Sequence, residues 1–407
     1  MATTPLGLAG FRPLVTCALI ALLVSSLALL LVPAPRASAL ANNNDDGHVY
    51  VLNNDLVGSN SITVFNREED GSLKSQGTTS IGGLGSLVAF ADGTQGSLIL
   101  THDEGTRLFA VDAGSNQISV VDVHDGHLSL EGVFPSGGVG PISLSYHDGL
   151  LYVLNAANGS TTTANVVGFK VDDEGDLHAI KGATGLLSTA RPNPAQVQID
   201  PSGRWLLVTE KLTNLIDVYR IHDDGSLGAR TSFPSTGLYP FGMAFNPARP
   251  QEFIVDDGFG FVGSNNTGAV TAYRLTQGSV GLVNGPVADF QLAPCWMVIT
   301  RDGRFAYTSN PDSHNISGFS IGDDGAISLL NSNGVTASTP SDTFPLEEGL
   351  SSNSRFLYAL DSRLLLKPQP GPATLSGFQV HEDGSLTPVI DPATFALPFS
   401  TIGLAAE

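Results

Sequence analysis

The chain is 407 residues long and carries 19 basic and 39 acidic residues, which gives a formal net charge of −20. Residues 1–39 contain two arginines and no acidic residue, so the rest of the chain has 17 basic and 39 acidic residues, a charge of −22. This charge argues against nucleic acid and anionic lipid surfaces as partners, because both repel an acidic protein. It is compatible with a small-molecule ligand, and with a bound divalent cation such as Ca²⁺ or Mg²⁺.

Residues 1–39 have the layout of a secretory signal peptide. Arg12 supplies a positive n-region, residues 14–32 form an apolar run, and Ala37-Ser38-Ala39 fits a cleavage site. We therefore expect a secreted, extracytoplasmic protein that has no membrane contact once the leader is removed. The alternative is an uncleaved anchor, because nineteen apolar residues approach a membrane-spanning length.

The tetrapeptide Asp-Gly-Ser-Leu recurs along the rest of the chain. Successive copies start 47 to 59 residues apart, which is the signature of a repeat architecture. The seven copies, with their variations, are Asp70-Gly71-Ser72-Leu73, Asp125-Gly126-His127-Leu128, Glu174-Gly175-Asp176-Leu177, Asp224-Gly225-Ser226-Leu227, Gln277-Gly278-Ser279-Val280, Asp324-Gly325-Ala326-Ile327 and Asp383-Gly384-Ser385-Leu386.

Each copy follows a segment of alternating apolar residues, such as I-D-V-Y-R-I before Asp224, and is followed by another apolar residue. This pattern predicts a β-hairpin. Two further strands precede it in most units, so each unit has about four short antiparallel strands. Seven such units predict an all-β, seven-bladed β-propeller. We expect the apolar tail, residues 399–407, to close the ring by pairing with the strand at residues 48–53.

The repeats override the length-based expectation of several domains. We interpret residues 40–47 as a linker and residues 48–407 as a single propeller domain, which we expect to be monomeric. Cys295 is the only cysteine after residue 39, so no disulfide within the chain can form there. Stability must come from a packed core.

The second predicted strand of each unit ends in an acidic or amide residue. The seven residues are Asn53, Asp112, Asn155, Glu210, Asp256, Asn310 and Asp361. Equivalent loops of a propeller lie on one face, so we expect these side chains to form a ring near the mouth of the channel. The alternative is structural, since Asn and Asp at strand ends commonly cap turns. Two members depart from the pattern: Glu210 is followed by Lys211, and Asp256 is followed by Asp257.

A second series marks the start of the innermost strands. It consists of Pro141-Ile142-Ser143, Pro194-Ala195-Gln196, Pro240-Phe241-Gly242, Pro294-Cys295-Trp296 and Pro340-Ser341-Asp342. Proline is tolerated at the first residue of a strand. The residues that follow should point toward the channel, where polar Gln196 and apolar Trp296 would together suit a small ligand. The Gly- and Asn-rich insert at residues 259–268 either overhangs the channel mouth or is a slack surface loop.

Two segments carry a resemblance to a known family. A-Q-V-Q-I-D-P-S-G-R-W-L-L-V-T-E-K and C-W-M-V-I-T-R-D-G-R-F-A-Y-T-S-N resemble repeats of the seven-bladed lactonase family, and the resemblance extends over residues 48–407. That family includes bacterial 6-phosphogluconolactonases and fungal carboxymuconate cyclases, and this chain is most similar to a secreted branch. The resemblance implies a hydrolase of lactones or related small cyclic esters that acts at the central channel.

The enzyme site of the family transfers only in part. The family carries a His where this chain has Ala195, an Arg-His pair at Phe241-Gly242, and an Asn-Glu pair at Asp256-Asp257. We hypothesise that Glu210, Lys211 and Asp257 are catalytic. The predicted substrate-binding residues are Gln196, Asp256, Asn155, Asn310, Asp361 and Arg363. The loss of the His and Arg leaves a non-catalytic propeller, which binds a ligand or a protein partner outside the membrane, as the alternative.

Overall fold

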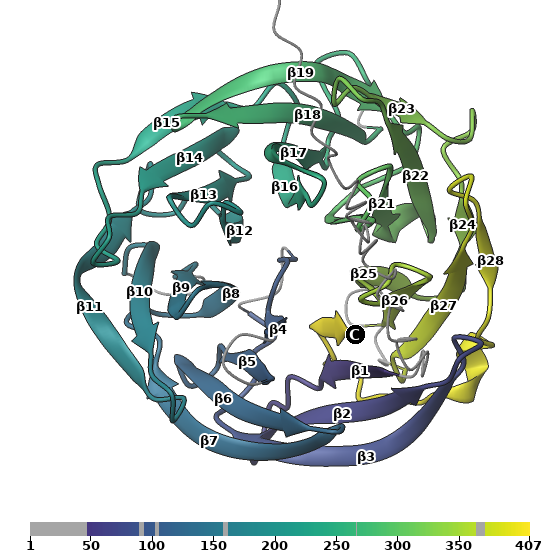
Figure 1. Ribbon diagram of the computed structural model, residues 1–407. Helices are drawn as coiled ribbons and strands as arrows, with labels where there is room; N and C mark the ends of the chain where they lie inside the picture. The colour runs from purple at the N-terminus through teal and green to yellow at the C-terminus, as the bar shows by residue number, and fades with distance from the viewer. Residues whose placement is uncertain (1–46, 89–92, 102–105, 158–161, 266, 364–370) are drawn as a thin grey trace, which may run out of the picture. The chain divides into compact units, whose positions relative to one another are not determined.

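The computed structural model describes residues 47–407, except for 89–92, 102–105, 158–161, 266 and 364–370 (Figure 1). The chain divides into two compact units, Met1–Asn44 and Asp45–Glu407, and the described residues belong to the second. The predicted leader and most of the predicted linker lie outside the described residues. Within the described residues, no helix is long and apolar enough to cross a membrane.

Seven antiparallel sheets, the blades, succeed one another around a common axis (Figure 1). Blade 1 contains β29 (Leu404–Ala406), β1 (Gly47–Leu52), β2 (Asn60–Arg67) and β3 (Leu73–Gly82). Blade 2 contains β4 (Leu98–Thr101), β5 (Arg107–Asp112), β6 (Gln117–His124) and β7 (His127–Pro135). Blade 3 contains β8 (Pro141–His147), β9 (Leu150–Asn155), β10 (Asn165–Val171) and β11 (Leu177–Leu186).

The remaining blades repeat this order. Blade 4 contains β12 (Pro194–Ile199), β13 (Trp205–Glu210), β14 (Leu215–Arg220) and β15 (Thr231–Pro234), and blade 5 contains β16 (Pro240–Asn246), β17 (Arg249–Asp257), β18 (Ala269–Thr276) and β19 (Ser279–Ala288). Blade 6 contains β20 (Trp296–Ile299), β21 (Phe305–Asn310), β22 (Asn315–Ile321) and β23 (Ile327–Leu329), and the short β24 (Ala337–Ser338) also pairs with β22. Blade 7 contains β25 (Phe344–Leu350), β26 (Phe356–Ser362), β27 (Thr374–Val380) and β28 (Leu386–Pro388).

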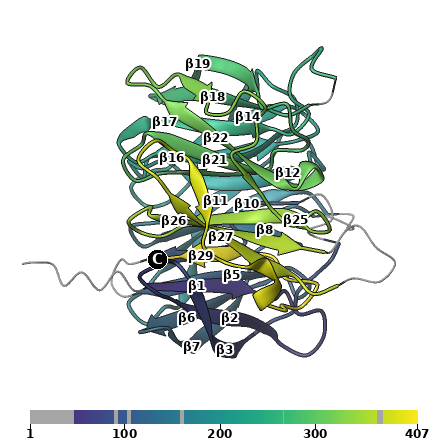
Figure 2. The same ribbon diagram turned by 90° about the vertical axis from the view of Figure 1, so that its right-hand side faces the viewer.

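The predicted all-β, seven-bladed propeller with four antiparallel strands per blade is therefore confirmed. The predicted closure by the C-terminal strand is confirmed as well. Strand β29 pairs with β1 in the registers Val49↔Ala406 and Val51↔Leu404. Figure 1 shows β29, from the yellow end of the chain, beside purple β1. Figure 2 shows the blades edge-on, stacked around the axis.

The turn of the Asp-Gly-Ser-Leu motif joins one blade to the preceding one at three of the blade interfaces that the structure describes. The glycine of the turn has a positive φ, +82° at Gly71 and at Gly384, which other residues rarely adopt. At these interfaces a tyrosine from the second strand of the preceding blade donates a hydrogen bond to the carbonyl of that glycine. Tyr307 of blade 6 bonds Gly384 of blade 7 at 2.9 Å, and Tyr358 of blade 7 bonds Gly71 of blade 1 at 2.8 Å. Tyr152 makes the same contact between blades 3 and 4.

Apolar side chains fill the spaces between blades. The second strand of each blade is buried over almost its whole length, as in β5, where all six residues are buried. The chain therefore needs no disulfide, and Cys295, the one cysteine among the described residues, is a buried free thiol. Because the blades pack face to face, only the edges of the innermost strands remain to line the axis of the ring.

Candidate functional site

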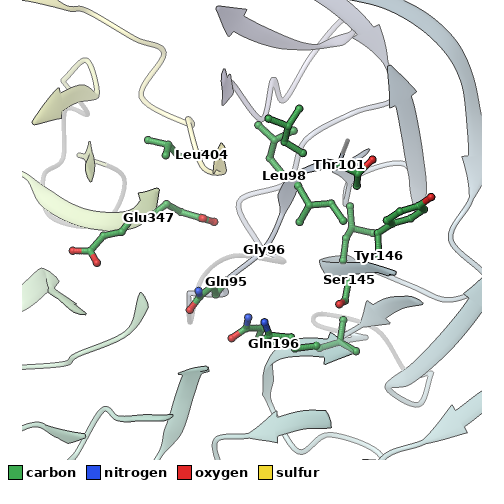
Figure 3. Close-up of a pocket in the computed structure, with 15 residues that line it drawn as sticks. Gln95, Gly96, Leu98, Thr101, Ser145, Tyr146, Gln196, Glu347 and Leu404 are labelled. Atoms are coloured by element: carbon green, nitrogen blue, oxygen red, sulfur yellow. The ribbon is translucent and has the colours of Figure 1, made fainter. Parts of the chain in front are cut away.

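The innermost strands enclose a cavity of about 280 Å³ on the axis of the ring (Figure 3). Its lining is mostly polar at the centre and apolar along β4. The lining residues are Gln95, Gly96, Leu98, Ile99, Leu100, Thr101, Leu144, Ser145, Tyr146, Gln196, Val197, Gln198, Glu347, Glu348 and Leu404. Gln196 and Glu347 are almost completely buried, whereas Thr101 and Tyr146 are half-buried. The cavity therefore opens toward the ends of the inner strands.

One end of the cavity is closed on the face where the chain crosses between blades, here called the crossover face. The short segment Gly93–Gly96, which leads into β4, enters the ring there. The Gln95 Nε2 amide donates to the Met297 carbonyl at 2.8 Å, and Gln95 Oε1 accepts from the Met297 N–H at 3.0 Å. A Cβ added at Gly242 would collide with Gln95 Oε1, so Gly242 leaves the space that this amide occupies.

The closing segment rests on an aromatic cluster. Phe241 and Trp296 pack with their ring centroids 5.3 Å apart, and Gly93 lies against both rings. Lys211 is 1% exposed, and its Nζ donates to the Gly93 carbonyl at 2.9 Å and lies 4.5 Å from the centroid of Phe241. The cation–π contact and the hydrogen bond stabilise this buried ammonium group. Lys211 thus holds the closing segment in place and does not line the cavity.

The insert at residues 259–268 lies on the same crossover face. The ring of Phe259 packs on Tyr239 with a centroid distance of 4.5 Å, and Tyr239 in turn contacts Phe241. Val262 is 88% exposed. The described part of the insert therefore begins over the closed end of the ring and extends into solvent, so it combines the two alternatives that the sequence left open.

Among the described residues, the inner edge of each innermost strand has no neighbouring strand to bond its backbone N–H groups. Side chains of the preceding blade accept hydrogen bonds from some of these groups instead. Ser145 Oγ of blade 3 accepts from the Ile199 N–H of blade 4 at 2.9 Å. Gln196 Oε1 of blade 4 accepts from the Met243 N–H of blade 5 at 2.5 Å. Blade 5 has Gly242 at the position equivalent to Gln196, and there Gln95 serves the next blade instead. The polar residues on the axis therefore satisfy backbone groups that would otherwise be buried without a partner.

Two adjacent glutamates of β25 supply the acidic groups of the cavity. Glu347 Oε1 accepts from Ser97 Oγ at 3.1 Å, and burial raises the pKa of Glu347 to about 8, although this hydrogen bond opposes the shift. Glu348 is 6% exposed, and neither of its oxygens has a hydrogen-bond partner among the described residues. Burial raises the pKa of Glu348 well above its usual value, and nearby Asp256 adds to that effect. Burial thus favours the neutral, protonated form of both groups.

Gln196, predicted as a substrate-binding residue, lines the cavity, and Figure 3 shows its amide beside that of Gln95. The other predicted site residues lie elsewhere. Asp256 is fully buried beside Thr308, and burial raises its pKa well above the usual value. Arg363 forms an ion pair with Asp342, 2.7 Å between Nη1 and Oδ2, outside the cavity lining.

The polar strand ends, which we expected to form a ring near the mouth of the channel, are absent from the lining of this cavity. The second strand stands one strand away from the axis, so the inner strand and the crossovers cover its end. Glu210 accepts from the Ser188 N–H at 2.8 Å and from Thr213 Oγ1 at 2.6 Å, and Asp257 accepts from Thr271 Oγ1. These groups bind the loops and the third strand of their own blades.

The other amide and acidic strand ends behave in the same way. Asn155 donates to the Ser136 carbonyl at 3.2 Å, Asn310 donates to Ser317 Oγ at 2.7 Å, and Asp361 accepts from Ser376 Oγ at 2.5 Å. None of these strand ends lines the cavity. The catalytic role of Glu210, Lys211 and Asp257 and the ligand contacts of Asn155, Asn310, Asp361, Asp256 and Arg363 stay predictions.

Sequence reasoning missed Glu347, and one signal could have found it. The series of strand-initial prolines was continued at Pro340, but β25 begins at Phe344. Pro345 pairs with Asp361 as Pro194 pairs with Glu210, and in both strands a bulge follows. Glu347 therefore occupies the position of Gln196, two residues after the proline.

The model of the lactonase family of seven-bladed β-propellers matches residues 162–255, which contain blade 4 and parts of blades 3 and 5. The resemblance to the lactonase family is confirmed for this segment. No curated protein sequence matches the chain.

Solved structures similar to this propeller include a putative 6-phosphogluconolactonase from Bacteroides fragilis, 17% identical, with a TM-score of 0.64 over 85% of this chain and 95% of that one. A periplasmic gluconolactonase from Pseudomonas aeruginosa is 16% identical, with a TM-score of 0.64 over 88% of this chain and 98% of that one. A protein from Lactobacillus plantarum is also 16% identical, with a TM-score of 0.66 and the same coverage. At these identities the likeness concerns the fold.

Proposed function

We propose that this lactonase-type propeller is an extracytoplasmic hydrolase that opens a lactone ring in the axial cavity. The observation that carries the proposal is Glu347, a buried carboxyl group on the cavity wall whose pKa is raised to about 8. A group that titrates near neutral pH can both accept and donate a proton during one reaction cycle. The family match over residues 162–255 supports the reaction class, and the predicted leader supports the location.

The proposed reaction adds one water molecule to the lactone and yields a hydroxy acid. The Glu347 carboxylate removes a proton from water as the water oxygen attacks the carbonyl carbon. The ring C–O bond then breaks, and Glu347 returns the proton to the leaving oxygen. Gln196, whose Oε1 is occupied by Met243, directs its Nε2 hydrogens toward the developing oxyanion, as preorganised amide donors do in acyl-transfer enzymes.

The test is turnover of a panel of sugar and aliphatic lactones by the purified protein, followed by acid release at constant pH. We expect Glu347→Gln to lower kcat by roughly 100-fold or more, as loss of a general acid–base group does. Glu210→Gln and Asp257→Asn serve as matched controls, because they make similar substitutions at buried carboxyl groups outside the cavity. If those two variants lose turnover while Glu347→Gln keeps it, the site lies where the sequence first placed it.

A non-catalytic ligand-binding propeller is the second candidate function. Ala195 and Phe241, at positions where the resemblance implies His and Arg, are buried in the aromatic cluster at the closed end. The described lining contains no His, Arg or Lys. Saturable binding of a lactone without turnover by the wild-type protein would favour this candidate over the hydrolase.

A further inference from the structure

We infer that the axial cavity selects small, uncharged, hydroxyl-bearing lactones and excludes phosphorylated and other anionic ones. This inference rests on the proposed function, because it names the substrate of the same cavity. It follows from three properties of the described lining, namely the absence of cationic groups, the presence of buried polar atoms without hydrogen-bond partners, and the small volume.

No cationic side chain among the described residues reaches the cavity. The lining residues include no His, Arg or Lys. The two cationic residues that the sequence suggested for the site have partners elsewhere, since Lys211 bonds the Gly93 carbonyl and Arg363 pairs with Asp342. A phosphate group entering the cavity would lose its hydration shell without gaining a countercharge, and that desolvation is costly. Glu347 and Glu348 on the same wall add acidic groups that repel an anion once they ionise.

Hydroxyl groups, in contrast, find partners there. Gln198 Oε1 and both Glu348 oxygens are buried and have no hydrogen-bond partner among the described residues. Buried polar atoms without partners cost free energy unless a ligand or water supplies a hydrogen bond. Ser145 and Gln95 add further polar atoms along the same cavity. A ligand hydroxyl group both donates and accepts, so it can pair with the Gln198 oxygen and with either form of the Glu348 carboxyl group.

The size of the cavity points the same way. Its volume of about 280 Å³ lies at the lower end of the range of small-molecule sites. The Gln95–Met297 contact closes the crossover end, so the cavity cannot extend in that direction. One small ring fits, whereas a bulky substituent has room only at the open end.

The experiment measures binding apart from turnover. The probes are the lactam analogue of a six-membered polyhydroxy lactone, which is not hydrolysed, and the 6-phosphate ester of the same lactam. Each probe is titrated calorimetrically into the purified protein at pH 7. We expect the affinity for the phosphate ester to be on the order of 100-fold lower than the affinity for the neutral lactam. Equal or tighter binding of the phosphate ester, or no binding of either probe, would overturn the inference.

A charge variant tests the physical cause. Gln198→Arg places a guanidinium group in the cavity and should increase affinity for the phosphate ester about 10-fold, because Arg pairs with phosphate in a bidentate manner. Glu382→Gln changes the net charge by the same +1 at an exposed position outside the lining and should leave both affinities unchanged. An equal increase in affinity for the phosphate ester in both variants would contradict the inference.

The two proposals fail in different ways. Preferential binding of the neutral lactam without turnover of any lactone would refute the hydrolase but keep the selectivity. Turnover of a phosphorylated lactone at least as fast as its neutral counterpart would keep the hydrolase and refute the selectivity.

Discussion

The side chain of Gln95 pairs with the backbone of Met297 as a short strand would, through one donated and one accepted hydrogen bond. Gly242, the residue of blade 5 that should have provided the acceptor, has no side chain. The glutamine therefore comes from blade 2, across the axis, and fills the space. This relationship explains why one end of the cavity is closed and why a glycine stands in the inner strand of blade 5.

Replacing Gln95 by alanine should destabilise the protein and open the closed end of the cavity. The Met297 N–H would lose its partner, and an unsatisfied buried group costs about 1–3 kcal/mol. Urea unfolding of Gln95→Ala measures this loss. Gln198→Ala is the matched control, because Gln198 Oε1 has no partner to lose, and it should change the free energy of unfolding by less than about 0.5 kcal/mol. Equal losses in the two variants would contradict the pairing.

Gly242→Ala should also destabilise the protein, because the new Cβ would collide with Gln95 Oε1 and would lie 2.5 Å from the Cys295 carbonyl oxygen. The new Cβ at position 242 and the side chain of Gln95 compete for one space, so the effects of the two substitutions on the free energy of unfolding should not add. In the Gln95→Ala background, Gly242→Ala should cost at least about 0.5 kcal/mol less than in the wild type. A double-mutant cycle by urea unfolding checks this, and strict additivity would show that the residues do not interact.

Acidic pH should stabilise this propeller. Burial raises the pKa of Asp112 to about 6, of Asp361 to about 7 and of Glu347 to about 8. A carboxyl group whose pKa is higher in the folded state than in the unfolded state binds its proton more tightly in the folded state. Its contribution to the free energy of unfolding is therefore fully present below the unfolded pKa near 4, and it is lost as the pH rises through the folded pKa. The free energy of unfolding should therefore fall between pH 4 and pH 8.

Surface aspartates oppose this trend only weakly. Asp224 and Asp383 have pKa values lowered by hydrogen bonds from the serines of their turns, but they are exposed, so solvent screens their contribution. Urea unfolding at pH 5 and pH 8 measures the balance, and Asp361→Asn should reduce the slope because it removes one buried acid. A free energy of unfolding that increases over this range would contradict the prediction.

The tyrosine–glycine hydrogen bonds between neighbouring blades should each stabilise the ring by a similar amount. Tyr307→Phe and Tyr358→Phe remove single O–H groups that bond the turn glycine of the next blade, and each should cost about 1 kcal/mol. The two sites lie in different blade interfaces, so the double variant should cost their sum. A negligible loss in both variants, measured by thermal or urea unfolding, would show that these hydrogen bonds contribute little.

The architecture could be predicted from the sequence because the same pattern of turns and strands recurs seven times along the chain. Each turn of the motif follows a strand of alternating apolar residues, and seven units of four short strands predict a propeller. The repeat also predicted how the ring closes. The tail at residues 399–407 supplies the innermost strand that blade 1 would otherwise lack.

The candidate cavity was harder to predict, because its lining depends on distance from the axis as well as on position in the repeat. Glu210 and Asp257 end the second strands of their blades and are absent from the cavity lining, a distinction that the repeat pattern does not contain; their catalytic role stays a prediction. Glu347 follows a proline, as Gln196 does, yet Pro340 nearby obscured the match. Gln95 gives no signal at all, since its role arises from a glycine that lies 147 residues away in the sequence.

The pairing of β29 with β1 has a consequence for biosynthesis. The first strand of the propeller must wait, with one edge unpaired, until the last strand has been synthesised. During translation, the growing chain thus carries an unpaired strand edge that can pair with a strand of another molecule. We expect a chaperone or rapid synthesis of the final blade to protect this edge, and slow synthesis of the final blade to favour strand-swapped dimers.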